Sequence, residues 1–252
     1  MEVHAHTHTE RKKFTHYLWE FIMLFLAVFC GFLAENEREH IVEKRRERQF
    51  MVSLVKDLEL DTSQLNRIQI FRQNSLADID SLSLFFSITH SKMVPLKMYT
   101  LIRSLLGSMY FFQNSGTLDQ LKNSGGFRLI HHRSIVDSIE AYDQQIRRMV
   151  VRDHFESELG QDNINLVGKL FKNSVALKIR TDTMLLKKNT SADQNIAFND
   201  QYLDEYLNHL MAFQDLIKIN LGVQITTKNR AINLIVLIKK EYQLAENTLL
   251  EK

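Results

Sequence analysis

The stretch FTHYLWEFIMLFLAVFCGFLAEN, residues 14–36, decides the fold, because it contains an unbroken apolar run from Phe21 to Ala34. From Tyr17 to Ala34, only Glu20 interrupts the apolar character of the segment. At about 1.5 Å rise per residue, such a helix covers about 27 Å, close to the roughly 30 Å of a bilayer's hydrocarbon core. We therefore predict one transmembrane helix over residues 14–36.

A cleavable secretory signal is the alternative, since it also has a basic start, here residues 11–13 (RKK), and a short apolar centre. Cleavage after Ala34 would place Phe32 at the −3 position, where a small residue is expected. The sequence therefore favours an uncleaved anchor over a signal peptide.

The charges around the span give a divided answer on orientation. Three Lys/Arg precede it and five follow it before residue 50, which favours a cytoplasmic C-terminal side. However, the three basic residues 11–13 abut the span, whereas residues 35–42 contain one Lys/Arg, which is Arg38. Positive charges nearest the helix ends matter most for orientation. We predict a single-pass protein of the bacterial inner membrane with a cytoplasmic N-terminus and a periplasmic C-terminal domain, and the reverse orientation stays open.

The composition predicts that the rest of the chain is nearly all α. Its 252 residues include one Pro and eight Gly, so there are few helix breakers. The net charge of +2 indicates no special partner, and no nucleic-acid motif is present. The single cysteine, Cys30, lies inside the apolar run, so no disulfide can form within the chain.

We expect four regions. Residues 1–13 form a polar tail whose His4, His6 and His8 lack the fixed geometry of a metal site. Residues 14–36 form the span, residues 37–48 a charged helical stalk, and residues 49–252 an α-helical bundle. The stalk carries a basic cluster that is a candidate contact for anionic lipid: Lys44, Arg45, Arg46 and Arg48.

A long amphipathic helix should follow from about residue 37 to 89, because apolar residues recur at steps of three and four. The slots at Asp61, Arg72 and Ser75 are polar, which disfavours a continuous two-stranded coiled coil and suits a bundle core better. Since Asp61 with Gln64 could cap a new helix, a break near residue 60 stays open.

Further helices are predicted over residues 96–112 and 134–159, and two more near the C-terminus, packed antiparallel if Gly222 ends the first. Between them, Gly125 suits a left-handed helix cap, and residues 190–197 are read as a loop. The basic segment 168–188 is interpreted as a solvated or lipid-facing patch. We thus predict an antiparallel helical bundle behind the anchor.

No catalytic, cofactor-binding or metal-binding constellation follows the anchor, so the prediction is a noncatalytic scaffold that binds protein partners or a second copy. One face of the span offers a candidate interface, at steps of seven, four and three: Glu20, Ala27, Gly31 and Ala34. The alternatives are an accessory subunit of an ion-coupled membrane complex that uses Glu20, and a ligand-sensing helical bundle.

Three segments carry a resemblance to known sequences: THYLWEFIMLFLAVFCGFLAENEREH, then FMVSLVKDLELDT, and later GTLDQLKNSGGFRLI. Together they resemble a family of uncharacterised bacterial single-span membrane proteins. In that family a short basic N-terminus, one span ending in Asn/Glu and a charged helix lead into an α-helical domain. The resemblance covers the first 65 residues best and residues 116–130 next, and it implies an architecture but no active site.

Overall fold

The computed structural model describes residues 14–89, 91–172 and 195–244. The predictions for the tail 1–13, for residues 173–188 of the basic segment and for residues 190–194 of the expected loop lie outside them. The chain divides into two compact units, Met1–Phe50 and Met51–Lys252. The predicted boundary between stalk and bundle, at 48/49, lies two residues from this division.

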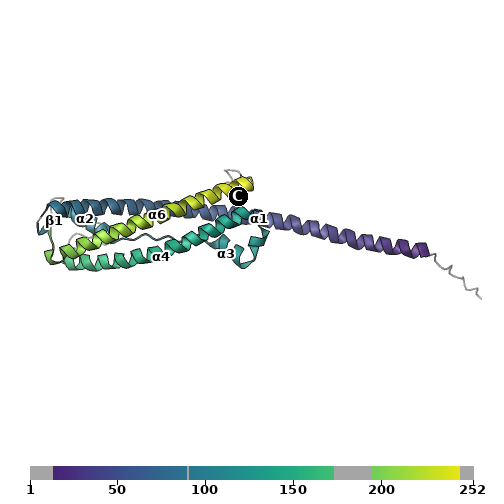
Figure 1. Cartoon of the computed structure of the whole chain (residues 1–252), viewed down its shortest axis with the longest axis horizontal. Helices are drawn as coiled ribbons and strands as arrows, with labels where there is room; N and C mark the ends of the chain where they lie inside the picture. The colour runs from purple at the N-terminus through teal and green to yellow at the C-terminus, as the bar shows by residue number, and fades with distance from the viewer. Residues whose placement is uncertain (1–13, 90, 173–194, 245–252) are drawn as a thin grey trace, which may run out of the picture. The chain divides into compact units, whose positions relative to one another are not determined.

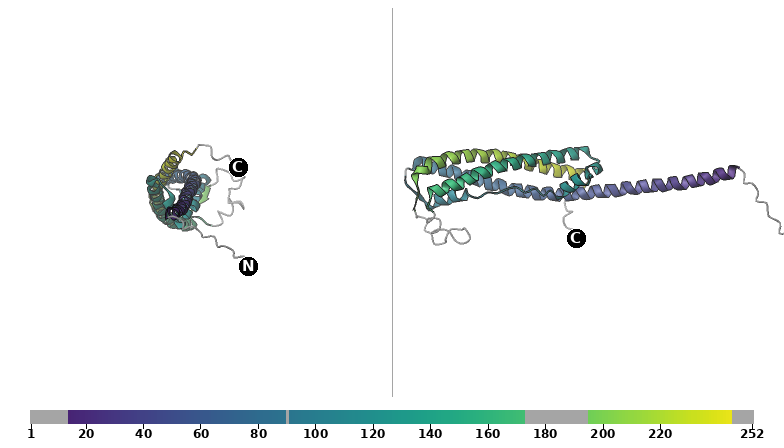
Figure 2. Two further views of the ribbon diagram at one scale, coloured as in Figure 1. Left: turned by 90° about the vertical axis from the view of Figure 1, so that its right-hand side faces the viewer. Right: turned by 90° about the horizontal axis from the view of Figure 1, so that it is seen from below.

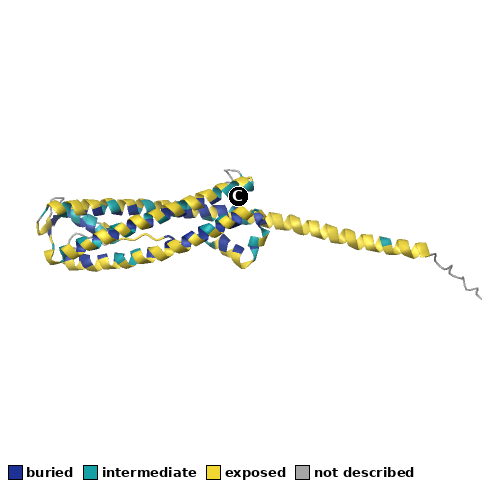
Figure 3. Cartoon of the chain, viewed as in Figure 1, coloured by how far each residue is buried: buried dark blue, intermediate teal, exposed yellow. Residues whose placement is uncertain are grey.

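The all-α fold class is confirmed. Its first helix, α1 (Phe14–Ile88), runs for 75 residues without a break, from the apolar stretch into the second unit. Asp61 therefore caps no new helix. Near the N-terminus, this helix is long and apolar enough to cross a membrane, and no part of its 18-residue apolar window is buried within the protein. Figure 3 shows the same contrast, since the residues coloured as buried gather in the bundle.

Three long helices build the bundle: α1, α4 (Arg133–Leu170) and α6 (Leu203–Glu241). Their mutual contacts fix their directions. Both Asp61 and Arg72 of α1 bond to α4 residues that lie 81 positions further along, and this constant offset means that α1 and α4 run the same way. The sequence separation of α1–α6 partners falls from 180 at Glu59 to 162 at Asn66 and 134 at Asp80, so α6 runs antiparallel to α1 (Figures 1 and 2).

A long crossover joins the two parallel helices. It contains β1 (Met93–Pro95), α2 (Leu96–Ser104), α3 (Gly116–Asn123) and the 3-10 helix η1 (Gly126–Leu129). As predicted, Gly125 has a left-handed backbone, with φ of 68°, between the last two elements. This glycine lets the chain turn directly from α3 into η1 at no steric cost.

The predicted helix over residues 96–112 is wrong at its C-terminal end, because α2 ends at Ser104. The backbone amides that a longer helix would need are taken by side chains of α1. The amide of Phe112 donates to Gln64 Oε1, and that of Asn114 donates to Asp61 Oδ1 at 2.8 Å. The segment 107–115 is therefore irregular, and it is held against α1 by long-range hydrogen bonds.

The expected loop over residues 190–197 is wrong for residues 195–197. They form β2 (Asn195–Ala197), which pairs antiparallel with β1 in the register Val94↔Ile196. Val94 and Ile196 are both buried, in a cluster that also holds Tyr99 and Phe171 edge to face at 4.9 Å. This small sheet closes one end of the bundle. It is followed by the 3-10 helix η2 (Asp200–Tyr202), which leads into α6.

The expected pair of C-terminal helices is in fact one helix, because α6 continues through Gly222. A single glycine costs a helix only about 1 kcal/mol relative to alanine, and one buried stripe runs along α6 on both sides of it. Similarly, α4 extends beyond the expected residue 159 to Leu170. On that helix Val150 is 52% exposed.

The core follows heptad spacing, so each helix turns one face inward. The buried positions of α6 recur at alternating steps of three and four: Tyr206, Leu210, Phe213, Ile217, Asn220, Gln224, Thr227, Ala231, Leu234 and Ile238. The middle of this stripe is polar. Polar residues also interrupt the stripes of α1 and α4, at Arg72 and Asp153, which are both buried.

Candidate functional site: a buried polar layer and two faces of the apolar helix

The predicted interface residues of the span all lie on α1, where steps of seven, four and three keep them on one side. All four are exposed: Glu20, Ala27, Gly31 and Ala34. Nothing lies within 4 Å of the point where a side chain on Gly31 would begin. This small-residue face is therefore open to close approach by another helix.

A different side of the same helix is aromatic. Phe25 stacks on Phe21 with ring centroids 6.5 Å apart, and on Phe29 at 5.9 Å. Steps of four residues place these rings in a row. The apolar segment thus has one side covered by large rings and another on which the backbone is accessible.

Glu20 has a partner within its own helix. His16 Nε2 lies 3.0 Å from Glu20 Oε1, one turn away. Both side chains are about half exposed. This contact gives the carboxylate a hydrogen-bonding partner at the N-terminal end of the apolar segment.

The stalk is helical and its basic cluster is exposed: Lys44, Arg45, Arg46 and Arg48. The stalk contains a charge pair, in which Arg38 Nε donates to Glu35 Oε2 at 2.9 Å. Such exposed pairs at i,i+3 add a few tenths of a kcal/mol to a helix. The exposure of the cluster is compatible with the predicted lipid contact, which stays a prediction.

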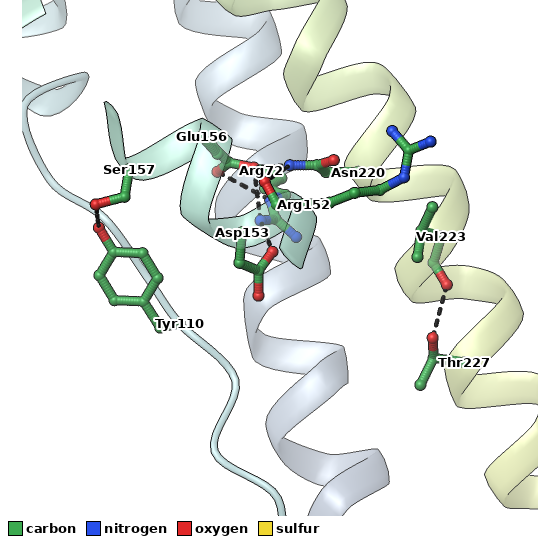
Figure 4. A network of polar contacts seen from close by, with 9 residues as sticks. All are labelled: Arg72, Tyr110, Arg152, Asp153, Glu156, Ser157, Asn220, Val223 and Thr227. Carbon is green, nitrogen blue, oxygen red and sulfur yellow. Dashed lines mark hydrogen bonds and ion pairs between the residues drawn. The ribbon is translucent and has the colours of Figure 1, made fainter. Parts of the chain in front are cut away.

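The most unusual group in the bundle is the guanidinium of Arg72, which is only 1% exposed. Its Nη2 donates to Asp153 Oδ1 at 2.8 Å and to Glu156 Oε2 at 2.6 Å, and its Nε donates to Glu156 Oε1 at 3.1 Å. From α6, Asn220 Nδ2 donates to Glu156 Oε2 at 2.6 Å. Figure 4 shows the four side chains meeting from three helices. We call these four residues the polar layer.

The charges of the polar layer do not cancel. One guanidinium faces two carboxylates, whose side chains are 10% and 13% exposed. Burial raises the pKa of Asp153 above its usual value, and this effect exceeds the lowering by Arg72. Asp153 in the layer therefore holds a proton more tightly than an exposed aspartate does.

Several buried polar atoms in and around the layer have no hydrogen-bond partner among the described residues. In the described part of the chain, the buried side-chain atoms without a hydrogen-bond partner include Arg72 Nη1, Asn220 Oδ1, and Nε2 and Oε1 of Gln224. A buried polar group without a partner costs about 1–3 kcal/mol. The layer thus costs stability while it specifies which residues face one another, as buried polar groups do in some helical assemblies.

A second polar contact lies further along the same pair of helices. Asp61, 1% exposed, accepts hydrogen bonds from Tyr142 Oη at 2.7 Å and from the amide and side chain of Asn114. Burial is the main cause that raises the pKa of both Asp61 and Tyr142. Since this contact and the polar layer share the offset of 81 residues, both hold α1 and α4 in one register.

Sequence reasoning found Arg72 as a polar slot but missed its partners. A signal for them was present, because Asp153 continues the inward stripe of α4 four residues after Met149, and Asn220 continues that of α6 three residues after Ile217. Polar residues at core positions of three helices should meet, since none of them can be buried alone at low cost.

The described residues contain no group of three or more His, Cys, Asp or Glu that could hold a metal ion. The four residues of the polar layer include no serine, cysteine or lysine. Comparisons with models of known protein families, with curated proteins and with solved structures find no match to this chain.

Proposed function

We propose that this protein is a noncatalytic, single-pass membrane anchor whose helical bundle binds protein partners or a second copy of itself at the periplasmic side of the bacterial inner membrane. The observation that carries the proposal is the unbroken helix α1. It contains the exposed apolar segment and is also one of the three long helices of the bundle. A chain built this way holds a folded helical surface at a membrane.

The small-residue face of the span supports a partner in the membrane. In lipid, helices associate through close van der Waals packing rather than through the hydrophobic effect, so small residues at the contact are favourable. Ala27 and Gly31 form such a pair, and the space beside Gly31 is open. The stacked rings of Phe21, Phe25 and Phe29 suit contact with acyl chains.

A crosslinking experiment in native membranes tests the proposal. A photoreactive residue at Leu24, seven positions before Gly31 and hence on the same side, should capture the partner of the span. Gly31→Ile should weaken this crosslink, because the branched side chain prevents close approach, whereas the control Phe25→Ile should leave it unchanged. Equal crosslinking in both variants would refute the small-residue interface.

The alternative role in an ion-coupled complex receives less support. Glu20 is hydrogen-bonded to His16 within its own helix, which accounts for a carboxylate at this depth without an ion pathway. If Glu20 nevertheless coupled ion movement to function, Glu20→Gln would abolish that function, while the anchor proposal expects little change.

A further inference from the structure

The outward face of α4 carries an open groove that the polar layer does not use. Its volume is about 620 Å³, and its lining residues all belong to three turns of the helix: Gln144, Arg147, Arg148, Val151, Arg152 and Phe155. Val151 is 58% exposed and Phe155 52% exposed, although both are large apolar side chains. The groove thus combines apolar surface with a concentration of arginine.

Two of the three arginines have no acidic partner among the described residues. Arg147 forms an ion pair with Asp143 one turn away, but no ion pair or hydrogen bond of this kind occupies the guanidinium of Arg148 or Arg152. In Figure 4 the guanidinium of Arg152 lies apart from the polar layer, although its backbone carbonyl accepts a hydrogen bond from Asn220. Charge is therefore available for a partner.

The spacing in the groove specifies the form of that partner. Arg148 and Arg152 are four residues apart, and so are Val151 and Phe155, so basic and apolar side chains form two adjacent rows along the helix. A second helix with carboxylates in one row and apolar side chains in the next, each at i,i+4, would match both rows.

The membrane that holds the anchor is a weaker candidate for this groove. Arg148 belongs to the unit Met51–Lys252, whereas the span belongs to the other unit, and in sequence Arg148 lies 112 residues after Asn36. The basic cluster of the stalk is much closer to the span in sequence. This favours a protein over lipid headgroups.

We propose that the groove on α4 binds an acidic amphipathic helix of a partner protein, whose carboxylates pair with Arg148 and Arg152 and whose apolar side chains pack on Val151 and Phe155. This inference rests on the proposed interaction function and names its surface. The contact is reversible and salt-dependent, because exposed charges steer association and are screened by salt.

The test uses the full chain in nanodiscs of zwitterionic phosphatidylcholine and a fluorescent synthetic helix that carries Glu and Leu in two rows at i,i+4. Arg148→Glu with Arg152→Glu should weaken peptide binding by about tenfold or more and reduce its salt dependence. Phe155→Ala should weaken binding without changing the salt dependence. The control, Lys56→Glu with Lys97→Glu on exposed positions of α1 and α2, makes the same charge change elsewhere and should have little effect.

Three results would overturn the inference: no binding of the peptide, an equal loss in the lysine control, or no binding of the peptide together with binding of the chain to added phosphatidylglycerol vesicles that depends on Arg148 and Arg152. The last result would assign the groove to anionic lipid instead. Each of them leaves the photocrosslink at Leu24 unaffected, so failure of the groove is distinguishable from failure of the membrane interface.

Discussion

Replacement of Arg72 by methionine should destabilise the bundle severely. The guanidinium makes three hydrogen bonds of 2.6–3.1 Å to two carboxylates, and Arg72→Met leaves both carboxylates without a cation. Removing one partner of a buried ion pair costs roughly 3–5 kcal/mol. Burial raises the pKa of Asp153 and protonation of this group relieves part of the cost, so the loss should be smaller at acidic pH than at neutral pH.

Thermal unfolding of the full chain, followed by far-UV circular dichroism, measures this effect. For a unit of about 200 residues, 3–5 kcal/mol lowers Tm by roughly 10 °C. Adding Asp153→Asn or Glu156→Gln to Arg72→Met should restore part of the loss, because each removes a carboxylate that has no cation. A loss below about 1 kcal/mol, or strictly additive effects in the double variants, would refute the reasoning about the polar layer.

Three further predictions address titration, helix continuity and orientation. Burial raises the pKa of Asp153, so the folded chain binds a proton on this group more tightly than the unfolded chain does. The stability that this proton adds is present below the ordinary aspartate pKa and is lost as the pH rises through the pKa of the folded chain. The Tm of Asp153→Asn should therefore fall less from acidic to neutral pH than that of the original chain, and an equal fall would contradict the shift. Gly222→Ala should stabilise the chain by about 0.5–1 kcal/mol, since nothing lies within 4 Å of the added carbon, whereas a loss would indicate a break in α6. In a Cys30→Ser background, cysteine at Asn229 should react with an impermeant maleimide once the outer envelope is opened and cysteine at Thr7 should not, and the reverse pattern would place the bundle in the cytoplasm.

The long helices were predictable because their stripes depend on local spacing alone. Most inward positions of α1 and α4 follow from apolar residues at steps of three and four, and the same spacing in α6 continues past Gly222 without a change of register. The break expected there gave too much weight to one glycine, whose cost of about 1 kcal/mol is small beside the burial of Ile217 and Ala231 on either side.

The end of α2 and the partners of Arg72 depend on contacts between distant parts of the chain. Residues 105–112 are apolar enough to continue a helix, but the Phe112 amide donates to Gln64, which lies 48 positions earlier. Likewise, the parallel direction of α1 and α4 follows from a crossover whose path no local pattern indicates. The sequence identified Arg72 as a polar position in the stripe of α1, but not the carboxylates that it contacts.

The proposed role requires that residues 14–36 remain attached and embedded in the membrane. The most direct measurement is alkaline carbonate extraction of membranes that contain the full chain, followed by the intact mass of the protein. We expect the whole chain in the membrane pellet at its uncleaved mass of 29.6 kDa. A soluble product that begins near Glu35 would show that the apolar segment is a removable signal, and it would contradict the account.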